Sequence, residues 1–202
     1  KYKEDKAEKK LGAIDEKLTA SEQFLEKNQK AVLYGLAAVV VVVGIFLAYR
    51  FLYVVPKNEK ARAAIFKGER YFQNEEDSLA LFGNNNDYIG FEAIIDRYKG
   101  TKTANLAHAY AGICYSRLGE NEKALRHLTK FKGGDLLIAP AVMGAIGDVY
   151  MNMNNPKEAV AYYKKAADKA NDEMLAPIYY KKIGQVYLHQ KDYDKAIETF
   201  TK

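Results

Sequence analysis

The stretch GDVYMNMNNPKEAVAYY, residues 147–163, contains the pattern that decides the fold. Its opening motif, Gly147-Asp-Val-Tyr150, also occurs at Gly112-Ile-Cys-Tyr115 and at Gly184-Gln-Val-Tyr187, spacings of 35 and 37 residues. Twelve residues after each Gly stands an Ala, and a large side chain follows four residues later: Ala124 and Leu128, Ala159 and Tyr163, Ala196 and Phe200. Three copies in phase predict an array of repeated helical units.

Turn residues separate the two expected helices of a unit. Asn155 is placed to cap the second helix, with Pro156 at its first position and Glu158 completing a capping box. Asp192 stands at the corresponding cap position of the third unit. Pro140 and Pro177, each after an Ala, are placed to open the first helices of the second and third units.

Residues 57–100 are interpreted as a degenerate first unit. We expect a long helix from about 57 to 82, a turn over Gly83–Asp87, and a second helix with apolar side chains at Phe91, Ala93, Ile94, Ile95 and Tyr98. The regular repeats then occupy about 105–139, 140–176 and 177–202, within a domain of residues 57–202.

This pattern resembles the tetratricopeptide repeat, which has a small residue at position 8, an aromatic at 11, Ala at 20 and a large side chain at 24. The resemblance implies an all-α solenoid in which Gly and Ala let helices approach, while Tyr and Phe fill the gaps between neighbouring hairpins. It also implies a concave groove for a protein helix or an extended peptide, formed by first-helix positions 2, 5, 9, 12 and 13. The groove residues implied here are Leu106, Ala109, Ile113, Ser116 and Arg117, then Ala141, Gly144, Asp148, Met151 and Asn152, then Ile178, Lys181, Gln185, Leu188 and His189.

Some members of that family use repeated Lys and Asn at these positions to clamp acidic peptide tails. In this chain only Lys181 and Asn152 match, so the sequence does not favour such a clamp.

A long apolar segment precedes the repeats. Residues Ala31 to Tyr49 carry no charge, and the apolar run continues past Arg50 to Val55. At 1.5 Å per residue the uncharged part spans roughly 28 Å, close to the thickness of the hydrocarbon core of a bilayer. We interpret residues 31–55 as an uncleaved transmembrane signal-anchor helix in contact with membrane lipid, with Arg50 reaching the headgroups.

Small residues recur along this predicted span. Gly44 and Ala48 lie four residues apart, as do Ala31 and Gly35, a spacing that allows another membrane helix to approach closely. Gly35, Gly44 and Ala48 are therefore candidate helix-contact residues.

Residues 1–30 form a charged tail with a narrow amphipathic stripe at Leu11, Ile14, Leu18 and Leu25. Thr19 and Glu22 would make a capping box there. Since the chain starts with Lys and stops within a helical pattern, we expect the natural protein to extend at both ends.

The charge pattern leaves the membrane orientation open. Lys57, Lys60 and Arg62 follow the span closely and favour a cytoplasmic repeat domain, but long domains are translocated largely regardless of charge.

The sequence gives no sign of catalysis. It has no Gly-rich phosphate loop, no nucleophile elbow and no paired Cys or His at metal spacing, so we expect no enzyme, cofactor, metal or small-molecule substrate. His108, His127 and His189 fall in different predicted helices without a carboxylate or Cys at ligand spacing, and Cys114 is read as a buried apolar residue. The net charge of +5 is spread along the chain and does not indicate nucleic acid.

Taken whole, the tail, span and repeats resemble the YfgM-like proteins of bacteria, also in the segment Phe24-Leu-Glu-Lys-Asn-Gln-Lys-Ala-Val-Leu-Tyr-Gly35. The resemblance implies a bacterial inner-membrane protein with a cytoplasmic N-terminus and a periplasmic repeat domain. It implies an ancillary subunit of the SecYEG translocon that works with a PpiD-like periplasmic chaperone on emerging polypeptides. Two alternatives stay open: a scaffold for another cell-envelope or secretion assembly, and a cytoplasm-facing membrane receptor.

Overall fold

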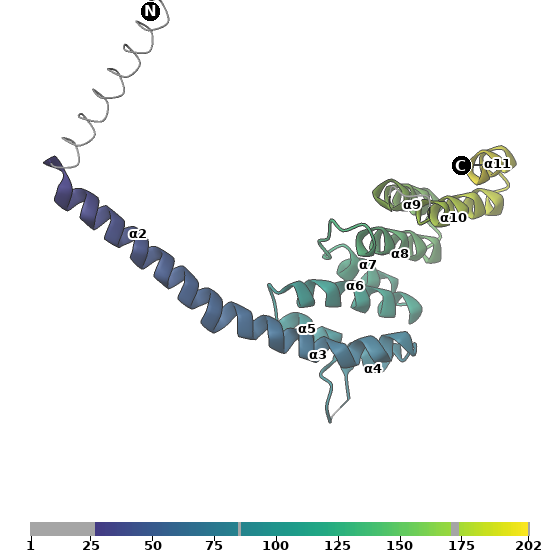
Figure 1. Cartoon of the computed structure of the whole chain (residues 1–202). Coiled ribbons are helices and arrows are strands. Elements are labelled where there is room, and N and C mark those ends of the chain that lie inside the picture. Colours follow the sequence, from purple (N-terminus) through teal and green to yellow (C-terminus); the bar gives the residue numbers. More distant parts are fainter. Residues whose placement is uncertain (1–26, 85, 171–173, 202) are drawn as a thin grey trace, which may run out of the picture. The chain divides into compact units, whose positions relative to one another are not determined.

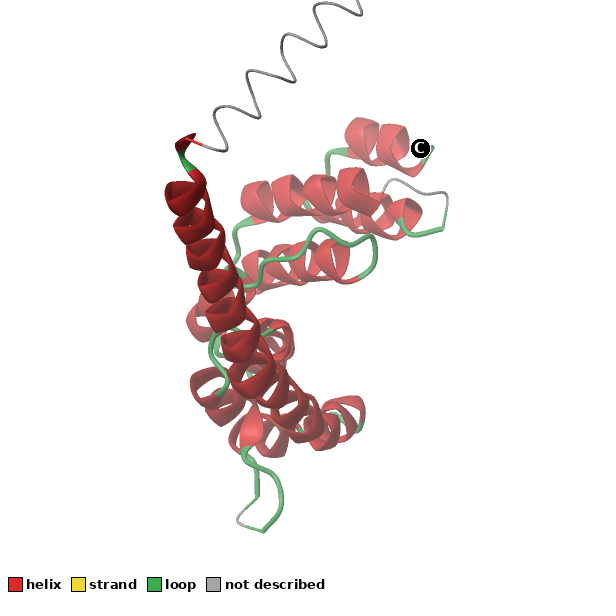
Figure 2. Ribbon diagram, turned by 60° about the vertical axis from the view of Figure 1, so that its left-hand side comes forward, coloured by secondary structure: helices red, strands yellow, loops and turns green. Residues whose placement is uncertain are grey.

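The computed structural model describes residues 27–84, 86–170 and 174–201 (Figure 1). The chain divides into two compact units, Lys1–Val55 and Pro56–Lys202. The described residues form helices and turns (Figure 2). Asn84 and Tyr88 form an isolated antiparallel bridge. The amphipathic stripe expected at Leu11–Leu25 and the capping box at Thr19 lie outside the described residues.

The first unit contains the apolar helix. Its α-helical part, α2 (Gln29–Tyr49), is followed by η1, a π-helix over Arg50–Val54. The side chains of α2 are exposed, and an 18-residue stretch of the helix that runs over Gln29–Gln73 has a mean hydropathy of 2.7, so this helix is long and apolar enough to cross a membrane. The widening to a π-helix at Arg50 was not predicted, because the apolar pattern continues without a break across it.

The second unit begins with α3 (Val55–Gln73), which is shorter than expected. The prediction of one helix from 57 to 82 is wrong, because the chain turns at Asn74–Glu76 and a separate helix, α4 (Asp77–Phe82), follows. Glu75 adopts a left-handed φ of 59°, and the amide of Glu76 donates back to the carbonyl of Tyr71 at 2.9 Å. This is the hydrogen-bonded termination common at helix C-termini, here without the usual Gly.

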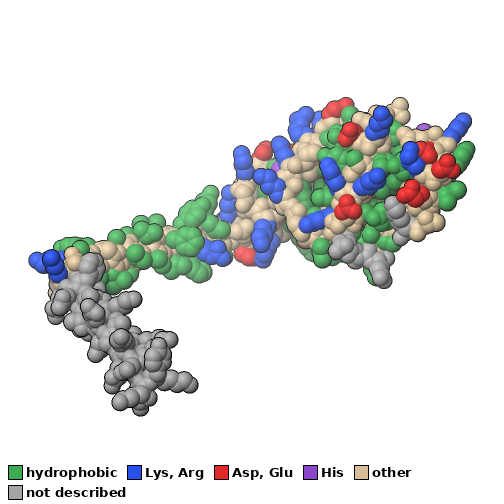
Figure 3. All heavy atoms as spheres, turned by 90° about the horizontal axis from the view of Figure 1, so that it is seen from above, with side chains coloured by type: hydrophobic (Ala, Val, Ile, Leu, Met, Phe, Trp, Pro, Cys, Tyr) green, Lys and Arg blue, Asp and Glu red, His purple; other side chains and the backbone are tan. Residues whose placement is uncertain are grey.

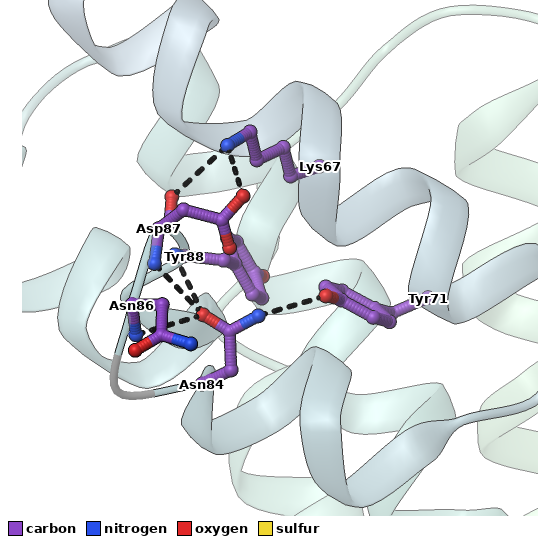
Figure 4. Close-up of polar contacts among 6 residues, drawn as sticks. All are labelled: Lys67, Tyr71, Asn84, Asn86, Asp87 and Tyr88. Atoms are coloured by element: carbon purple, nitrogen blue, oxygen red, sulfur yellow. Dashed lines mark hydrogen bonds and ion pairs between the residues drawn. The ribbon is translucent and has the colours of Figure 1, made fainter.

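The predicted turn at Gly83–Asp87 is confirmed, and Asn84 organises it (Figure 4). The Asn84 Oδ1 accepts hydrogen bonds from the backbone amides of Asp87 and Tyr88 at 2.9 and 3.1 Å, while its Nδ2 donates to the Tyr71 hydroxyl at 2.9 Å. Lys67 pairs with the Asp87 carboxylate from α3. The loop is thus fixed to α3 by side chains at both of its ends.

The remaining helices form the expected series of antiparallel hairpins. α5 (Gly90–Arg97) is the second helix of the degenerate unit. Three hairpins follow: α6 (Lys102–Arg117) with α7 (Asn121–Leu128), α8 (Ile138–Asn152) with α9 (Pro156–Ala170), and α10 (Ala176–His189) with α11 (Tyr193–Phe200). α7 packs on α8 and α9 packs on α10, so each hairpin contacts the next, as in a solenoid.

The repeat glycines explain why the hairpins close so tightly. A Cβ placed on Gly112 would lie 2.5 Å from Leu128, one on Gly147 would lie 2.5 Å from the Tyr163 ring, and one on Gly184 would lie 2.4 Å from Phe200. Each Gly therefore faces the large residue sixteen positions later in its own hairpin. Tyr163 therefore packs within its own hairpin, whereas Tyr179 packs against Gly144 of the preceding unit and is the Tyr that fills a gap between neighbouring hairpins.

The helix starts follow the predicted cap chemistry in part. The Asp192 carboxylate accepts a hydrogen bond from the Lys195 amide at 3.3 Å, as predicted, and α9 begins at Pro156. For α8 the sequence pointed to Pro140, whereas the N-terminus is capped by Asp135, whose Oδ1 accepts from the amides of Leu137 and Ile138 at 3.0 and 2.5 Å.

Candidate functional site

The predicted groove residues fall into three groups by exposure. Those that are exposed are Arg117, Ala141, Asn152, Ile178, Lys181, Gln185, Leu188 and His189. Those that are half-buried are Leu106, Ile113, Ser116, Asp148 and Met151, and those that are buried are Ala109 and Gly144. Ala109 is 3% exposed, so it offers no side-chain surface to a partner while the helices stay packed.

The half-buried apolar members support the solenoid itself. Leu106 and Ile113 pack against the core shared by α3 to α8, and Met151 packs against the core formed by α9 and α10. Their free surface is small, so the exposed groove residues are the ones available to a partner.

The exposed residues are concentrated on α10. Ile178, Lys181, Gln185 and Leu188 follow one another at spacings of 3, 4 and 3, which places them on one face of that helix. Ile178 is 50% and Leu188 45% exposed, with polar side chains between them. We call these four residues the α10 face.

Arg117 is exposed but engaged within the chain. Its Nη1 donates to the Phe72 carbonyl at 3.2 Å and to the Asp77 carboxylate at 3.3 Å, and its guanidinium lies 4.5 Å from the centre of the Phe72 ring. Asp77 is buried, so this ion pair neutralises a charge that would otherwise be costly inside the fold. Arg117 thus joins α6 to the end of α3, a role that the sequence did not reveal.

Asp148 is also paired. Its carboxylate accepts from Lys182 Nζ at 2.5 and 2.7 Å and from the Tyr163 hydroxyl at 2.7 Å, joining α8, α9 and α10. Burial, followed by the bond to Asp148, raises the pKa of Tyr163. The Asp148 charge is therefore largely satisfied before any partner binds.

A polar cluster that the sequence analysis missed joins α5, α6 and α7. Glu92 Oε1 accepts from the Tyr115 hydroxyl at 2.6 Å and lies 3.3 Å from His127 Nε2, while His127 Nδ1 lies 3.2 Å from His108 Nδ1. One assignment of hydrogens satisfies all three contacts: His127 donates to Glu92 and accepts from His108. Spacing within the sequence did not reveal the contact between Glu92 and His127, because the two residues lie on different helices.

The electrostatics of this cluster follow from those contacts. The hydrogen bond from His127, with the one from Tyr115, lowers the pKa of Glu92 from 4.5 to about 2. Burial, and then the neighbouring His127, lowers the pKa of His108. The cluster therefore has an ionised Glu92 and a neutral His108 at neutral pH.

Glu92→Gln is expected to destabilise the repeat domain at neutral pH but not in acid. The pKa of the carboxyl group is near 4.5 in the unfolded chain and about 2 in the folded chain. Its contribution to the free energy of unfolding is therefore present above pH 4.5 and is lost as the pH falls toward 2. At neutral pH the loss should be about 1 kcal/mol, since Glu92 is partly exposed.

Thermal unfolding of the native chain and of Glu92→Gln across this pH range measures the gap between their unfolding temperatures. It should narrow toward pH 2, and a gap that stays constant would contradict the assignment. The exposed Glu122 of α7 provides the control, Glu122→Gln, which should show no such convergence.

Within residues 27–84, 86–170 and 174–201 there is no group of three or more His, Cys, Asp or Glu side chains arranged to hold a metal ion. Cys114 is fully buried, and burial raises the pKa of its thiol, with Asp77 adding to the effect. Such a thiol is a poor nucleophile at neutral pH. Among the described residues, the exposed α10 face is a surface available for binding.

Comparison with known families agrees with this arrangement. A family model described as tetratricopeptide repeat matches residues 140–168 and 177–202, which are the α8–α9 and α10–α11 hairpins. No curated protein matches the chain. The predicted fold class, an apolar helix long enough to span a membrane followed by a tetratricopeptide-repeat solenoid, is confirmed, and such repeats are protein–protein interaction modules.

Proposed function

We propose that the chain is a non-catalytic, membrane-anchored interaction module of a bacterial inner membrane and serves as an ancillary subunit of the SecYEG translocon. Its repeat domain would lie in the periplasm and work with a PpiD-like anchored chaperone on polypeptides that emerge from the translocon. The proposal is supported by the resemblance of tail, span and repeats to the YfgM-like proteins. The observation that carries it is the exposed α10 face on a chain whose described residues include an apolar helix of spanning length.

The α10 face is suited to a helix or an extended segment of another protein. Ile178 and Leu188 offer apolar contacts about 15 Å apart along the helix, with Lys181 and Gln185 between them as hydrogen-bonding groups. A tether that keeps this face near the membrane raises its effective concentration there, so that weak contacts suffice for function.

The span supplies the second contact of the proposed mechanism. A Cβ at Gly35 or Gly44 would meet no heavy atom within 4 Å, and Gly44 and Ala48 lie on one side of α2. A neighbouring membrane helix from the translocon or the chaperone could approach closely there and gain van der Waals contact.

Gentle solubilisation of membranes, capture of the tagged full chain and mass spectrometry of co-purifying chains test the proposal. Translocon subunits together with an anchored chaperone, at comparable abundance, are expected. Their absence, with envelope-assembly proteins in their place, would contradict the translocon assignment and favour a scaffold for another assembly.

Two variants separate the proposed contacts. Ile178→Asp combined with Leu188→Asp should reduce recovery of soluble-domain partners at least about tenfold, because each removes an apolar anchor and adds a charge. Leu118→Asp with Met153→Asp is the matched control, since both side chains are similarly exposed but lie outside the α10 face. Gly44→Leu should instead reduce recovery of membrane partners, and unchanged recovery would contradict the helix contact.

The orientation is tested separately. Protease added outside the inner membrane should digest the repeat domain if that domain is periplasmic. Protection would favour the cytoplasm-facing receptor, the alternative supported by Lys57, Lys60 and Arg62 directly after the span.

A further inference from the structure

One edge of the repeat domain gathers the starts of its first helices. Lys57, in the first turn of α3, donates through Nζ to the Lys99 carbonyl in the loop before α6, at 2.8 Å. Asn105, in the second turn of α6, exchanges two hydrogen bonds with the backbone of Lys132, at 2.8 and 2.9 Å, in the loop before α8. Figure 1 shows both loops on the side of the domain where α3 begins. We call this side the α3 edge.

The α3 edge carries an exposed apolar tip. Leu136, Leu137 and Ile138 are consecutive and are 60%, 69% and 40% exposed. Asp135 caps the helix that starts behind them, so the tip is held in a defined place rather than hanging from a loose loop. Three consecutive large apolar side chains in water are costly for a soluble surface and are typical of a surface that another phase or molecule covers.

Lysines lie on the same edge as this tip. Lys99, Lys102, Lys130 and Lys132 are exposed, and Figure 3 shows Lys and Arg side chains over the part of the domain where α3 begins. A hollow of about 470 Å³ opens here and is lined by Lys99, Thr101, Asn105, His108 and Lys130, with Asp96 as its acidic member. Apolar residues flanked by lysines form the combination that binds the interface of an anionic bilayer.

We infer that the α3 edge docks on the surface of the bilayer that α2 crosses, with Leu136–Ile138 inserted at the boundary between headgroups and acyl chains. The bilayer is the partner that the chain connection brings to this edge. Pro56 directly follows the apolar segment, so the start of α3 is held close to the lipid whatever the angle between the two units. Lys99, Lys102, Lys130 and Lys132 then contact anionic headgroups. This inference rests on the membrane anchoring in the proposed function and on none of its partner assignments.

The test places a fluorescent probe on the tip of the full-length chain in lipid vesicles. Leu137→Cys is labelled with an environment-sensitive maleimide, and Met153→Cys is the control, because α8 separates the two positions by about 22 Å. Cys114 is fully buried, so the unmodified chain serves as the labelling blank. Vesicles of phosphatidylcholine, with or without phosphatidylglycerol, contain a lipid-borne quencher.

Docking predicts a blue-shifted emission at position 137 that the lipid quencher reduces, and neither effect at position 153. Lys99→Glu with Lys102→Glu should reduce the equilibrium constant for docking in phosphatidylglycerol vesicles about 25-fold, at about fivefold per lysine. Without phosphatidylglycerol the two proteins should behave alike.

Three results would overturn the inference. One is a probe at position 137 that remains water-exposed in both kinds of vesicle. Another is a blue shift that grows with protein concentration and resists the lipid quencher, which would assign the tip to a second copy of the chain. The third is a chain that fails to float with vesicles at all, which removes the tether and with it the membrane anchoring, whereas loss of translocon partners alone leaves docking intact.

Discussion

Gly147→Val is expected to lower the free energy of unfolding of the repeat domain by about 3 kcal/mol. A Cβ at this position would lie 2.5 and 2.6 Å from two ring carbons of Tyr163, and the branched side chain adds two further methyl groups. The ring cannot move aside cheaply, because Tyr163 is 3% exposed and its hydroxyl is bonded to Asp148. Either the α8–α9 hairpin opens or the ring leaves its site, and both disrupt packing onto α10.

Denaturant unfolding of the full chain in detergent, followed by circular dichroism, measures this loss. Gly147→Ala should cost less, because the smaller clash is partly offset by about 1 kcal/mol of helix propensity. The decisive control is the double variant with Tyr163→Leu: removing the ring should recover part of the loss, so the two changes should not add. Additive effects would show that the Gly147–Tyr163 contact does not set the hairpin spacing.

This contact also marks how far the sequence could predict the fold. The spacing from each repeat Gly to its large partner is fixed along the chain, so Gly112, Gly147 and Gly184 predicted hairpins correctly. Period and composition determine which residues share a helix face. They do not determine which neighbouring helix that face meets, so the sequence could not separate Tyr163, which packs within its hairpin, from Tyr179, which packs between two hairpins.

The same limit explains the break after Gln73. Residues 74–76 contain neither Gly nor Pro, so no local signal marked an end to the predicted helix over 57–82. The helix ends there because Glu75 takes a left-handed conformation and Arg117, more than forty residues away, donates to the Phe72 carbonyl near the new end. A termination that depends on a distant side chain is invisible to a local pattern.

For the candidate site, sequence reasoning located the helices but not the exposure of individual residues. The family's groove positions on α10 are exposed, whereas Ala109 of α6 is buried. The corresponding residue of the regular second unit, Gly144, is also buried, against the Tyr179 ring of the following unit, so burial at this position depends on packing between units that the pattern of one repeat does not record. The contact of Glu92 with His127 likewise depends on how α5 and α7 meet α6, which no spacing within one helix records.

Val40→Arg combined with Val43→Arg is expected to abolish membrane integration, the largest effect predicted for this chain. Both positions lie near the middle of the apolar segment 31–55, far from either end, so neither arginine can reach the headgroups easily. On the insertion scale the Leu, Ile, Val and Phe side chains of α2 contribute roughly −3 to −6 kcal/mol in total, while each central Arg costs about 3 kcal/mol. Two arginines therefore make the summed free energy of insertion unfavourable, and one arginine alone should leave partial integration.

Alkaline carbonate extraction of membranes measures the result. The native chain and the size-matched variant Val40→Leu with Val43→Leu should stay in the pellet, Val41→Arg should divide between the fractions, and the double Arg variant should appear in the supernatant. A loss of expression would lower the amount of protein in both fractions, whereas a loss of integration moves the protein from the pellet to the supernatant, so the two effects can be told apart. If the double Arg variant stays in the pellet, lipid burial of α2 is not what holds the chain to the membrane, and both the anchor and the docked α3 edge lose their physical basis.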